Sequence, residues 1–251
     1  MSKQSREMEI VEHLDELRKR IFIVLGVFIA AFAASFIFVE EIYDLLTKDL
    51  GTQLVVLGPL DIILIYLSIA AVIALAVTVP VIISQVWMFV KPGLTEEERK
   101  ASAVYIPVSF VLFAAGILFG YFIILPLVLQ FLLALGEGTF QTMFTADRYF
   151  QFVLRMTVPF SILFEMPLVV MFLTTIGVIS PYGMQKNRKY AYFAIVIVSV
   201  LVSPPDFLSD VLVILPLIVL YEISIRLSAV VYKKRLRRLR EEEKNASSGS
   251  M

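Results

Sequence analysis

Cysteine is absent from this 251-residue chain, and histidine occurs only once. Without cysteine there are no disulfide bonds and no thiolate metal sites, and the redox compartment stays open. A single histidine also falls short of the ligand set of a structural zinc ion. The sequence has no nucleotide-binding loop, no H-E-x-x-H motif and no Ser/His/Asp set that one histidine could serve. We therefore expect a protein that is not an enzyme and holds neither a metal nor another cofactor.

Charge is also scarce: 18% of the residues are charged, whereas 59% are hydrophobic and the mean hydropathy is +0.86. Soluble domains contain about 45–50% apolar residues. The composition therefore predicts an integral membrane protein, with the lipid bilayer as its surroundings and no nucleic-acid partner. Residues 2–16 are polar and acidic, so a cleavable signal peptide of the usual form is not expected.

Six apolar runs predict an all-α membrane protein with six transmembrane helices. A helix needs about 20 apolar residues to cross the hydrocarbon core. The runs are 21–39, 62–90, 101–136, 150–178, 190–202 and 211–221. The last two are short and cover only about 16–20 Å as helices. Flanking residues could lengthen them, the bilayer could thin locally, or the pair could form a re-entrant hairpin; we favour thinning around a turn at 203–210.

The basic residues predict the orientation of these spans. Eighteen Lys and Arg residues lie in one set of alternating connections and termini, and two lie in the other set. The positive-inside rule then places both termini in the cytoplasm. The expected organisation is a cytoplasmic amphipathic helix at 1–20, a six-span domain at 21–226 and a basic cytoplasmic tail at 227–251. The composition of 245–251 is typical of a disordered or artificially added extension.

Proline and glycine patterns predict how the spans are shaped and packed. Prolines that would kink the spans occur in many of them: Pro80, Pro107, Pro126, Pro159, Pro167 and Pro216. Kinked helices suit a concave wall better than a straight bundle. Gly116 and Gly120 form a G-x-x-x-G pattern, which is typical of a close-packing helix face. Glu222 and Arg226 are four positions apart and predict a structural ion pair within one helix.

Glu165 is the most unusual polar residue, because nine uncharged residues precede it and twenty follow it. A carboxylate at the membrane midplane costs several kcal/mol, so its default interpretation is a functional site. The alternative is a hydrogen-bonded packing device within a helix bundle. Arg155 lies about 15 Å away along the helix and is not its direct partner. Gln85 is one candidate partner among several.

Two acidic stretches are expected on the cytoplasmic side. Glu9, Glu12 and Glu16 share one face of the N-terminal amphipathic helix, and three consecutive glutamates occupy 96–98. Solvated charges on a surface helix would explain the first stretch, and a capping box from Thr95 to Glu98 explains part of the second. Together the stretches would also suit a ligand with paired arginines, because carboxylates bind guanidinium groups through two hydrogen bonds.

Several ordered motifs resemble the TatC family, the multispanning receptor subunit of the twin-arginine protein translocase. Residues 13–20, H-L-D-E-L-R-K-R, resemble the H-L-x-E-L-R-x-R opening of that family, and residues 89–99 resemble its F-x-x-P-x-L-x-x-x-E-R loop. Further similar blocks are Val79-Pro80 with Gln85, Trp87 and Phe89, then 121–126, 164–167 and 203–206. The resemblance spans about residues 10–226.

This resemblance implies a receptor for twin-arginine signal peptides on folded proteins. It also implies a multi-pass protein of a bacterial or archaeal cytoplasmic membrane that works in a homo- or hetero-oligomeric complex. TatA- and TatB-type single-span subunits would be its partners, and the proton-motive force would drive transport. Glu98 would be the main carboxylate for the arginines of the signal peptide, in one cytoplasmic site with Glu96, Glu97, Glu16, Arg18 and Phe89. Glu165 and Gln85 would be intramembrane polar residues, and Asp206 would lie in the outer turn.

Two other functions fit the residues without the resemblance. A proton-coupled secondary transporter would use Glu165 as its proton carrier and would move a small molecule. A membrane-assembly scaffold would bind no ligand, and neutralising Glu98 would then change nothing.

Overall fold

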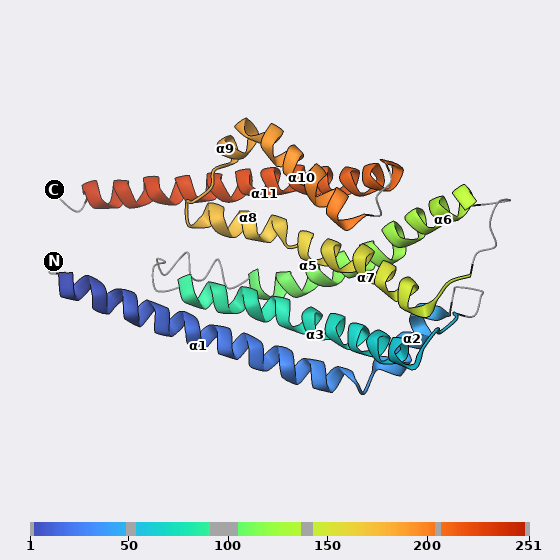
Figure 1. Cartoon of the computed structure of the whole chain (residues 1–251). Helices are drawn as coiled ribbons and strands as arrows, with labels where there is room; N and C mark the ends of the chain where they lie inside the picture. Colours follow the sequence, from blue (N-terminus) through green and yellow to red (C-terminus); the bar gives the residue numbers. More distant parts are fainter. Residues whose placement is uncertain (1–2, 49–53, 91–104, 137–142, 204–206, 249–251) are drawn as a thin grey trace. The chain divides into compact units, whose positions relative to one another are not determined.

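The computed structural model describes residues 3–48, 54–90, 105–136, 143–203 and 207–248, and the regular elements within these ranges are all helices (Figure 1). The chain divides into two compact units. The first unit comprises 1–94 and 138–154, and the second comprises 95–137 and 155–251. Helix α7 (Ala146–Leu163) contributes residues to both units.

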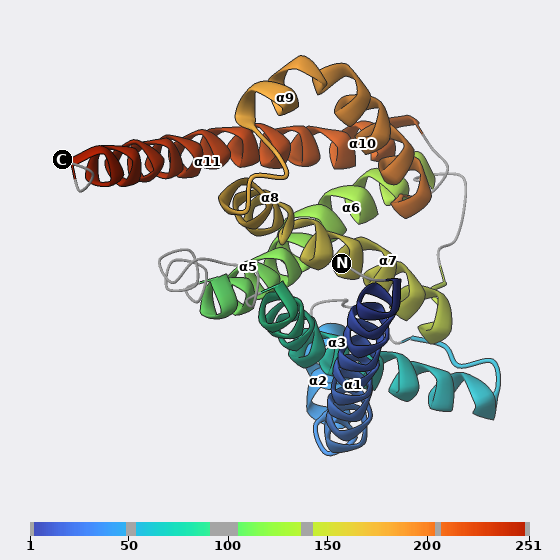
Figure 2. The same cartoon turned by 90° about the vertical axis from the view of Figure 1, so that its left-hand side faces the viewer.

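The first unit is built around two long helices, α1 (Lys3–Ser35) and α3 (Pro59–Val90). They pack side by side, as the two views of Figures 1 and 2 show. A short helix, α2 (Val39–Thr47), follows α1 at an angle of 70°. The ring of Tyr43 on α2 stacks on Phe150 of α7, with 5.3 Å between the ring centroids. These aromatic contacts attach the start of α7 to the first unit.

The second unit contains the remaining helices. In chain order these are α5 (Tyr105–Phe119), a π-helical turn η2 (Gly120–Ile124), α6 (Leu125–Gly136), the end of α7, α8 (Met166–Thr175), α9 (Pro181–Lys186), α10 (Arg188–Val202) and α11 (Phe207–Ser248). Helix α8 lies along α11 in both views (Figures 1 and 2). The buried hydroxyls of Thr174 and Ser228 join these two helices at 2.8 Å.

Prolines lie both inside the helices and in their first turns. Pro80, Pro159 and Pro216 are inside α3, α7 and α11. Pro167 occupies the first turn of α8, where its missing N–H leaves no helical hydrogen bond unmade. Pro126 follows η2, in which the N–H of Leu125 donates to the carbonyl of Gly120. Pro126 and Pro167 thus stand next to interruptions of regular helix, whereas Pro80, Pro159 and Pro216 lie within continuous helices.

The helix lengths partly agree with the expected spans. Four segments are long and apolar enough to cross a membrane: Pro59–Phe89, Tyr105–Gly136, Ala146–Thr175 and Ser209–Arg237. The bent pair Leu14–Ser35 and Val39–Thr47 makes a fifth candidate. Helix α10 is short, with 15 residues.

The prediction of a short last helix is wrong, because α11 has 42 residues. The sequence estimate counted only the apolar run 211–221. Glu222 and Arg226 end that apolar run, but neither residue interrupts a helix. The sequence has no glycine or proline between Glu222 and Ser248. Helices α1 and α11 also run without a break through residue 20 and residue 226, so neither expected domain boundary coincides with a helix end.

The G-x-x-x-G face does pack closely, as predicted. A methyl group placed on Gly116 would lie 2.5 Å from the Cα atom of Ser161, and one on Gly120 would lie 2.9 Å from the carbonyl oxygen of Met156. Both contacts are with the backbone of α7, which cannot move aside as a flexible side chain could. These two glycines therefore set the distance between α5–η2 and α7.

We expect Gly116→Ala to destabilise the fold by about 1–3 kcal/mol, because it overpacks this helix contact. Gly26→Ala is the matched control, since a methyl group at Gly26 would meet no atom within 4 Å. Thermal unfolding of both variants in detergent tests the difference. An equal loss of stability in the two variants would contradict the close-packing role of Gly116.

Candidate functional site

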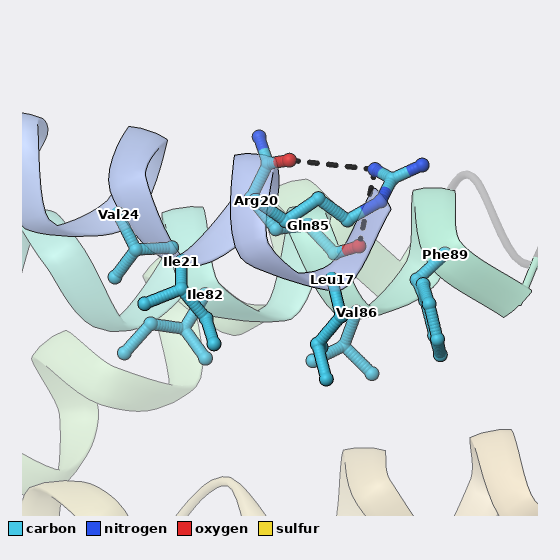
Figure 3. A pocket seen from close by; sticks show the side chains of 8 residues that line it. All are labelled: Leu17, Arg20, Ile21, Val24, Ile82, Gln85, Val86 and Phe89. Carbon is cyan, nitrogen blue, oxygen red and sulfur yellow. Dashed lines mark hydrogen bonds between the residues drawn. The ribbon is translucent and has the colours of Figure 1, made fainter. Parts of the chain in front are cut away.

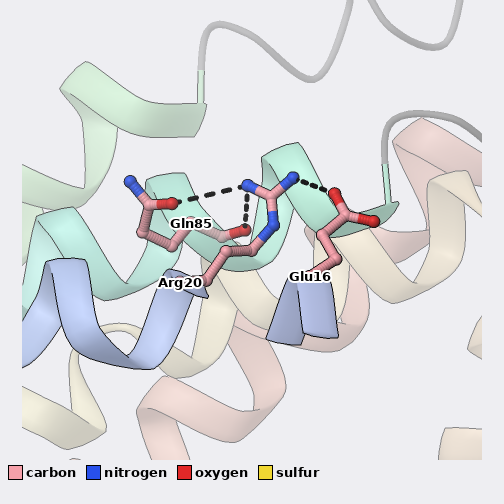
Figure 4. A network of polar contacts seen from close by, with 3 residues as sticks. All are labelled: Glu16, Arg20 and Gln85. Atoms are coloured by element: carbon pink, nitrogen blue, oxygen red, sulfur yellow. Dashed lines mark hydrogen bonds and ion pairs between the residues drawn. The ribbon is translucent and has the colours of Figure 1, made fainter. Parts of the chain in front are cut away.

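A polar network joins α1 to α3 within the first unit (Figure 4). The Nη2 atom of Arg20 donates a hydrogen bond to the carboxylate of Glu16, one turn earlier in α1. The Nη1 atom of Arg20 donates to both the backbone carbonyl and the side-chain Oε1 of Gln85, each at 3.4 Å. The Arg20 side chain is only 18% exposed. One guanidinium group therefore uses acceptors from two helices.

Local helix geometry explains why these groups meet. Residues four apart lie on the same face of a helix, so Glu16 and Arg20 pair within α1. Their neighbours face elsewhere: Arg18 and Lys19 both pair with Asp15, at 2.8 Å and 3.4 Å. The side chain of Arg18 is 68% exposed. Arg18 is therefore a surface cation beside the network and does not belong to it.

An apolar cavity of about 290 Å³ lies next to Arg20, between α1 and α3 (Figure 3). It is lined by Leu17, Arg20, Ile21, Val24, Ile82, Gln85, Val86 and Phe89. The Phe89 ring lies below the Arg20 guanidinium, with 6.0 Å between the guanidinium carbon and the ring centroid, which is within cation–π range. The cavity thus combines aliphatic walls with a polar rim, an arrangement that suits a ligand with one charged and one apolar part.

Glu165 belongs to the second unit and lies at the break between α7 and α8. Its side chain is buried, with 5% of the residue exposed. Neither carboxylate oxygen has a hydrogen-bond partner among the described residues. Arg155 is exposed and forms no ion pair with it, as expected from their spacing. The packing interpretation of Glu165 needs a hydrogen bond, which the described part of the chain does not supply.

Several expected site residues have no described structure. Glu96, Glu97 and Glu98 lie in the segment 91–104, and Asp206 lies in 204–206; both segments are outside the described residues. The structure brings together three residues of the expected site around Arg20, namely Glu16, Gln85 and Phe89.

The sequence patterns predicted neither the contacts of Arg20 nor the partner of Glu222. The spacing of Glu16 and Arg20 was a usable signal, but nothing in the sequence pointed from Arg20 to Gln85. The predicted pair of Glu222 with Arg226 is wrong. Glu222 instead accepts hydrogen bonds from Arg188 and from the Tyr192 hydroxyl, both at 2.7 Å. Contacts between α10 and α11 take precedence over the pairing within one helix.

Comparison with known proteins identifies the family. The profile of the Sec-independent protein translocase protein TatC matches residues 12–216. The chain belongs to the TatC family. It is 51% identical over 232 residues to TatCd of Bacillus subtilis (strain 168), a match that covers 92% of this chain and 96% of that protein. It is 37% identical over 252 residues to TatC of Halalkalibacterium halodurans, covering 97% of this chain and 99% of that protein.

The fold of the TatC family is also present. A crystal structure of the twin-arginine translocase receptor TatC aligns with a TM-score of 0.77 at 34% sequence identity. The alignment covers 87% of this chain and 99% of that chain. The chain is therefore a TatC subunit of a Sec-independent protein translocase, a multi-pass membrane protein of the bacterial Tat system. As a translocase component it is a transport protein and not an enzyme, as the lack of catalytic motifs predicts.

Proposed function

We propose that this TatC protein is the subunit that recognises twin-arginine signal peptides, and that the α1–α3 cavity is part of the recognition site. The observation that carries the proposal is the network of Glu16, Arg20 and Gln85 at the rim of an apolar cavity. These acceptors already hold one guanidinium group. A signal peptide needs a site of this kind, because it combines arginines with an apolar segment.

The carboxylates of the site would come from two stretches of the chain. The family resemblance assigns the main carboxylate to Glu98 and places Glu16 in the same cytoplasmic site. Glu96 and Glu97 precede Glu98 and would add negative charge beside it. A carboxylate and a guanidinium form two parallel hydrogen bonds, whereas a lysine ammonium offers only a point charge. Arg18 would act as an exposed cation near the entrance, and Phe89 would form the aromatic base of the site.

Glu165 would act after recognition, in the transport step. It lies within the candidate span Ala146–Thr175, is almost fully buried, and has no hydrogen-bond partner among the described residues. A polar partner in the membrane would satisfy it. Single-span TatA- and TatB-type subunits are the proposed partners, within an oligomeric complex that moves folded proteins with the proton-motive force. Gln85 would be an intramembrane polar residue of the recognition network, through its contact with Arg20, and Asp206 would belong to the outer turn.

The proposed topology has six spans with both termini in the cytoplasm. The five candidates found by length and composition become six when the 15-residue helix α10 also crosses. A membrane thinner than average near α10 would accommodate its length. The strong asymmetry of Lys and Arg between the two sets of connections supports the orientation.

Labelling with a membrane-impermeant maleimide tests this topology, and the absence of native cysteine removes any background. Met143 is 77% exposed between α6 and α7, and Gln185 is exposed on α9. In intact cells we expect Met143→Cys to be labelled and Gln185→Cys to be protected until the membrane is opened. Labelling of both sites in intact cells would contradict the six-span arrangement.

Binding of a labelled twin-arginine signal peptide to the purified protein tests the proposed function. We expect the twin-arginine peptide to bind at least about tenfold more tightly than a twin-lysine version, since the lost bidentate bonds cost about 1.4 kcal/mol or more. Glu98→Gln should abolish this preference. Equal binding of both peptides, or binding unaffected by Glu98→Gln, would contradict the receptor function.

Glu165→Ala should separate recognition from transport. We expect the variant to fold and to bind the twin-arginine peptide as the wild type does, because Glu165 belongs to neither the cavity nor the Glu98 loop. Export of a folded reporter protein should be lost. If Glu165→Ala abolished peptide binding as strongly as Glu98→Gln, the two sites would not be separate.

A further inference from the structure

The acceptors of the α1–α3 network are occupied by an arginine of the chain itself. Arg20 engages the Glu16 carboxylate, the Gln85 amide oxygen and the Gln85 backbone carbonyl, and it lies over the Phe89 ring (Figures 3 and 4). An incoming arginine would use the same kinds of group, namely a carboxylate, neutral oxygens and an aromatic face. The acceptors of this network are thus already occupied in the structure.

Arg20 differs from the neighbouring cations in its surroundings. Its side chain is 18% exposed, and its Nε atom is buried without a hydrogen-bond partner among the described residues. Lys19, one position earlier, is 71% exposed and pairs with Asp15. The buried Nε shows that Arg20 does not use its full hydrogen-bonding capacity in the network. Its contacts to Gln85 are also long, at 3.4 Å. A guanidinium that makes shorter contacts to Gln85 would bind these acceptors more strongly.

We propose that Arg20 is a specificity-determining residue that occupies the guanidinium site until the arginine of a signal peptide displaces it. This inference rests on the proposed function, because it assumes that Glu16 receives the signal peptide. Arg20 leaves the site by exchange with the guanidinium of the incoming arginine.

The exchange explains how one site can favour arginine over lysine. A ligand guanidinium restores the hydrogen bonds that Arg20 gives up, because it has the same planar set of donors. A lysine ammonium restores only part of these hydrogen bonds. The free energy lost when the Arg20 contacts break therefore weakens the binding of a lysine ligand. Selectivity obtained this way lowers the affinity for every ligand, and it lowers the affinity for lysine most.

Peptide binding to the full-length protein in detergent, with Arg20→Gln beside Lys19→Gln, tests the proposal. Both variants lose one positive charge from the same turn of α1, but only Arg20→Gln frees Glu16 and Gln85. We expect Arg20→Gln to bind the twin-arginine peptide about three- to fivefold more tightly than Lys19→Gln does, as expected for removal of a partly exposed competing ion pair. The ratio of twin-arginine to twin-lysine affinity should fall in Arg20→Gln and stay at the wild-type value in Lys19→Gln.

Arg20→Lys provides a second variant that keeps the charge and should raise the twin-arginine affinity to a smaller extent. Arg20→Lys takes the place of Arg20→Gln in the binding experiment if thermal unfolding shows that Arg20→Gln does not fold. Unchanged or weaker peptide binding in the folded Arg20 variants, with normal binding by the wild type, would overturn the role of Arg20 alone. Failure of the wild type and of every variant to bind the twin-arginine peptide would overturn the receptor function together with this inference.

Discussion

The hydrocarbon core is the constraint on which the rest of this structure depends, because it offers no water to satisfy a polar group. Helices meet this constraint because their backbone N–H and C=O groups form hydrogen bonds within the helix. Buried hydroxyl groups form hydrogen bonds to backbone carbonyls one turn earlier in the same helix. Thr78 donates to the carbonyl of Ala74 at 2.7 Å, and Ser224 donates to that of Leu220 at 2.8 Å. Two charged groups differ from these hydroxyls. Arg20 draws on acceptors from two helices, and Glu165 has none among the described residues.

In the proposed function these two groups act at two stages of transport. The Arg20 network lies at the rim of the α1–α3 cavity, where we propose that a signal-peptide guanidinium replaces that of Arg20. Glu165 lies at the break before Pro167, where α7 ends and α8 begins, so the backbone there already departs from regular helix. A carboxylate that is buried and unsatisfied needs a polar group from another molecule or another segment. The proposed single-span subunits can supply that group.

Much of the fold could be predicted from the sequence, because hydropathy, proline and glycine act locally. The apolar runs located the long helices, and Gly116 and Gly120 marked a close helix contact that the structure contains. Contacts between helices could not be predicted in the same way. No sequence pattern indicated that Gln85 binds Arg20 or that Glu222 binds Arg188 in place of Arg226, since each pairing depends on how two helices pack. The length of α11 was underestimated because helix formation continues where hydropathy falls.

Site-specific photo-cross-linking tests most directly whether the α1–α3 cavity receives the signal peptide. Val86 and Val77 both lie on α3 and are 49% and 43% exposed, but only Val86 lines the cavity. With a photoreactive phenylalanine analogue at either position, the twin-arginine peptide should cross-link at 86 and not at 77. Equal cross-linking at the two positions, or cross-linking only at 77, would contradict the cavity as the recognition site.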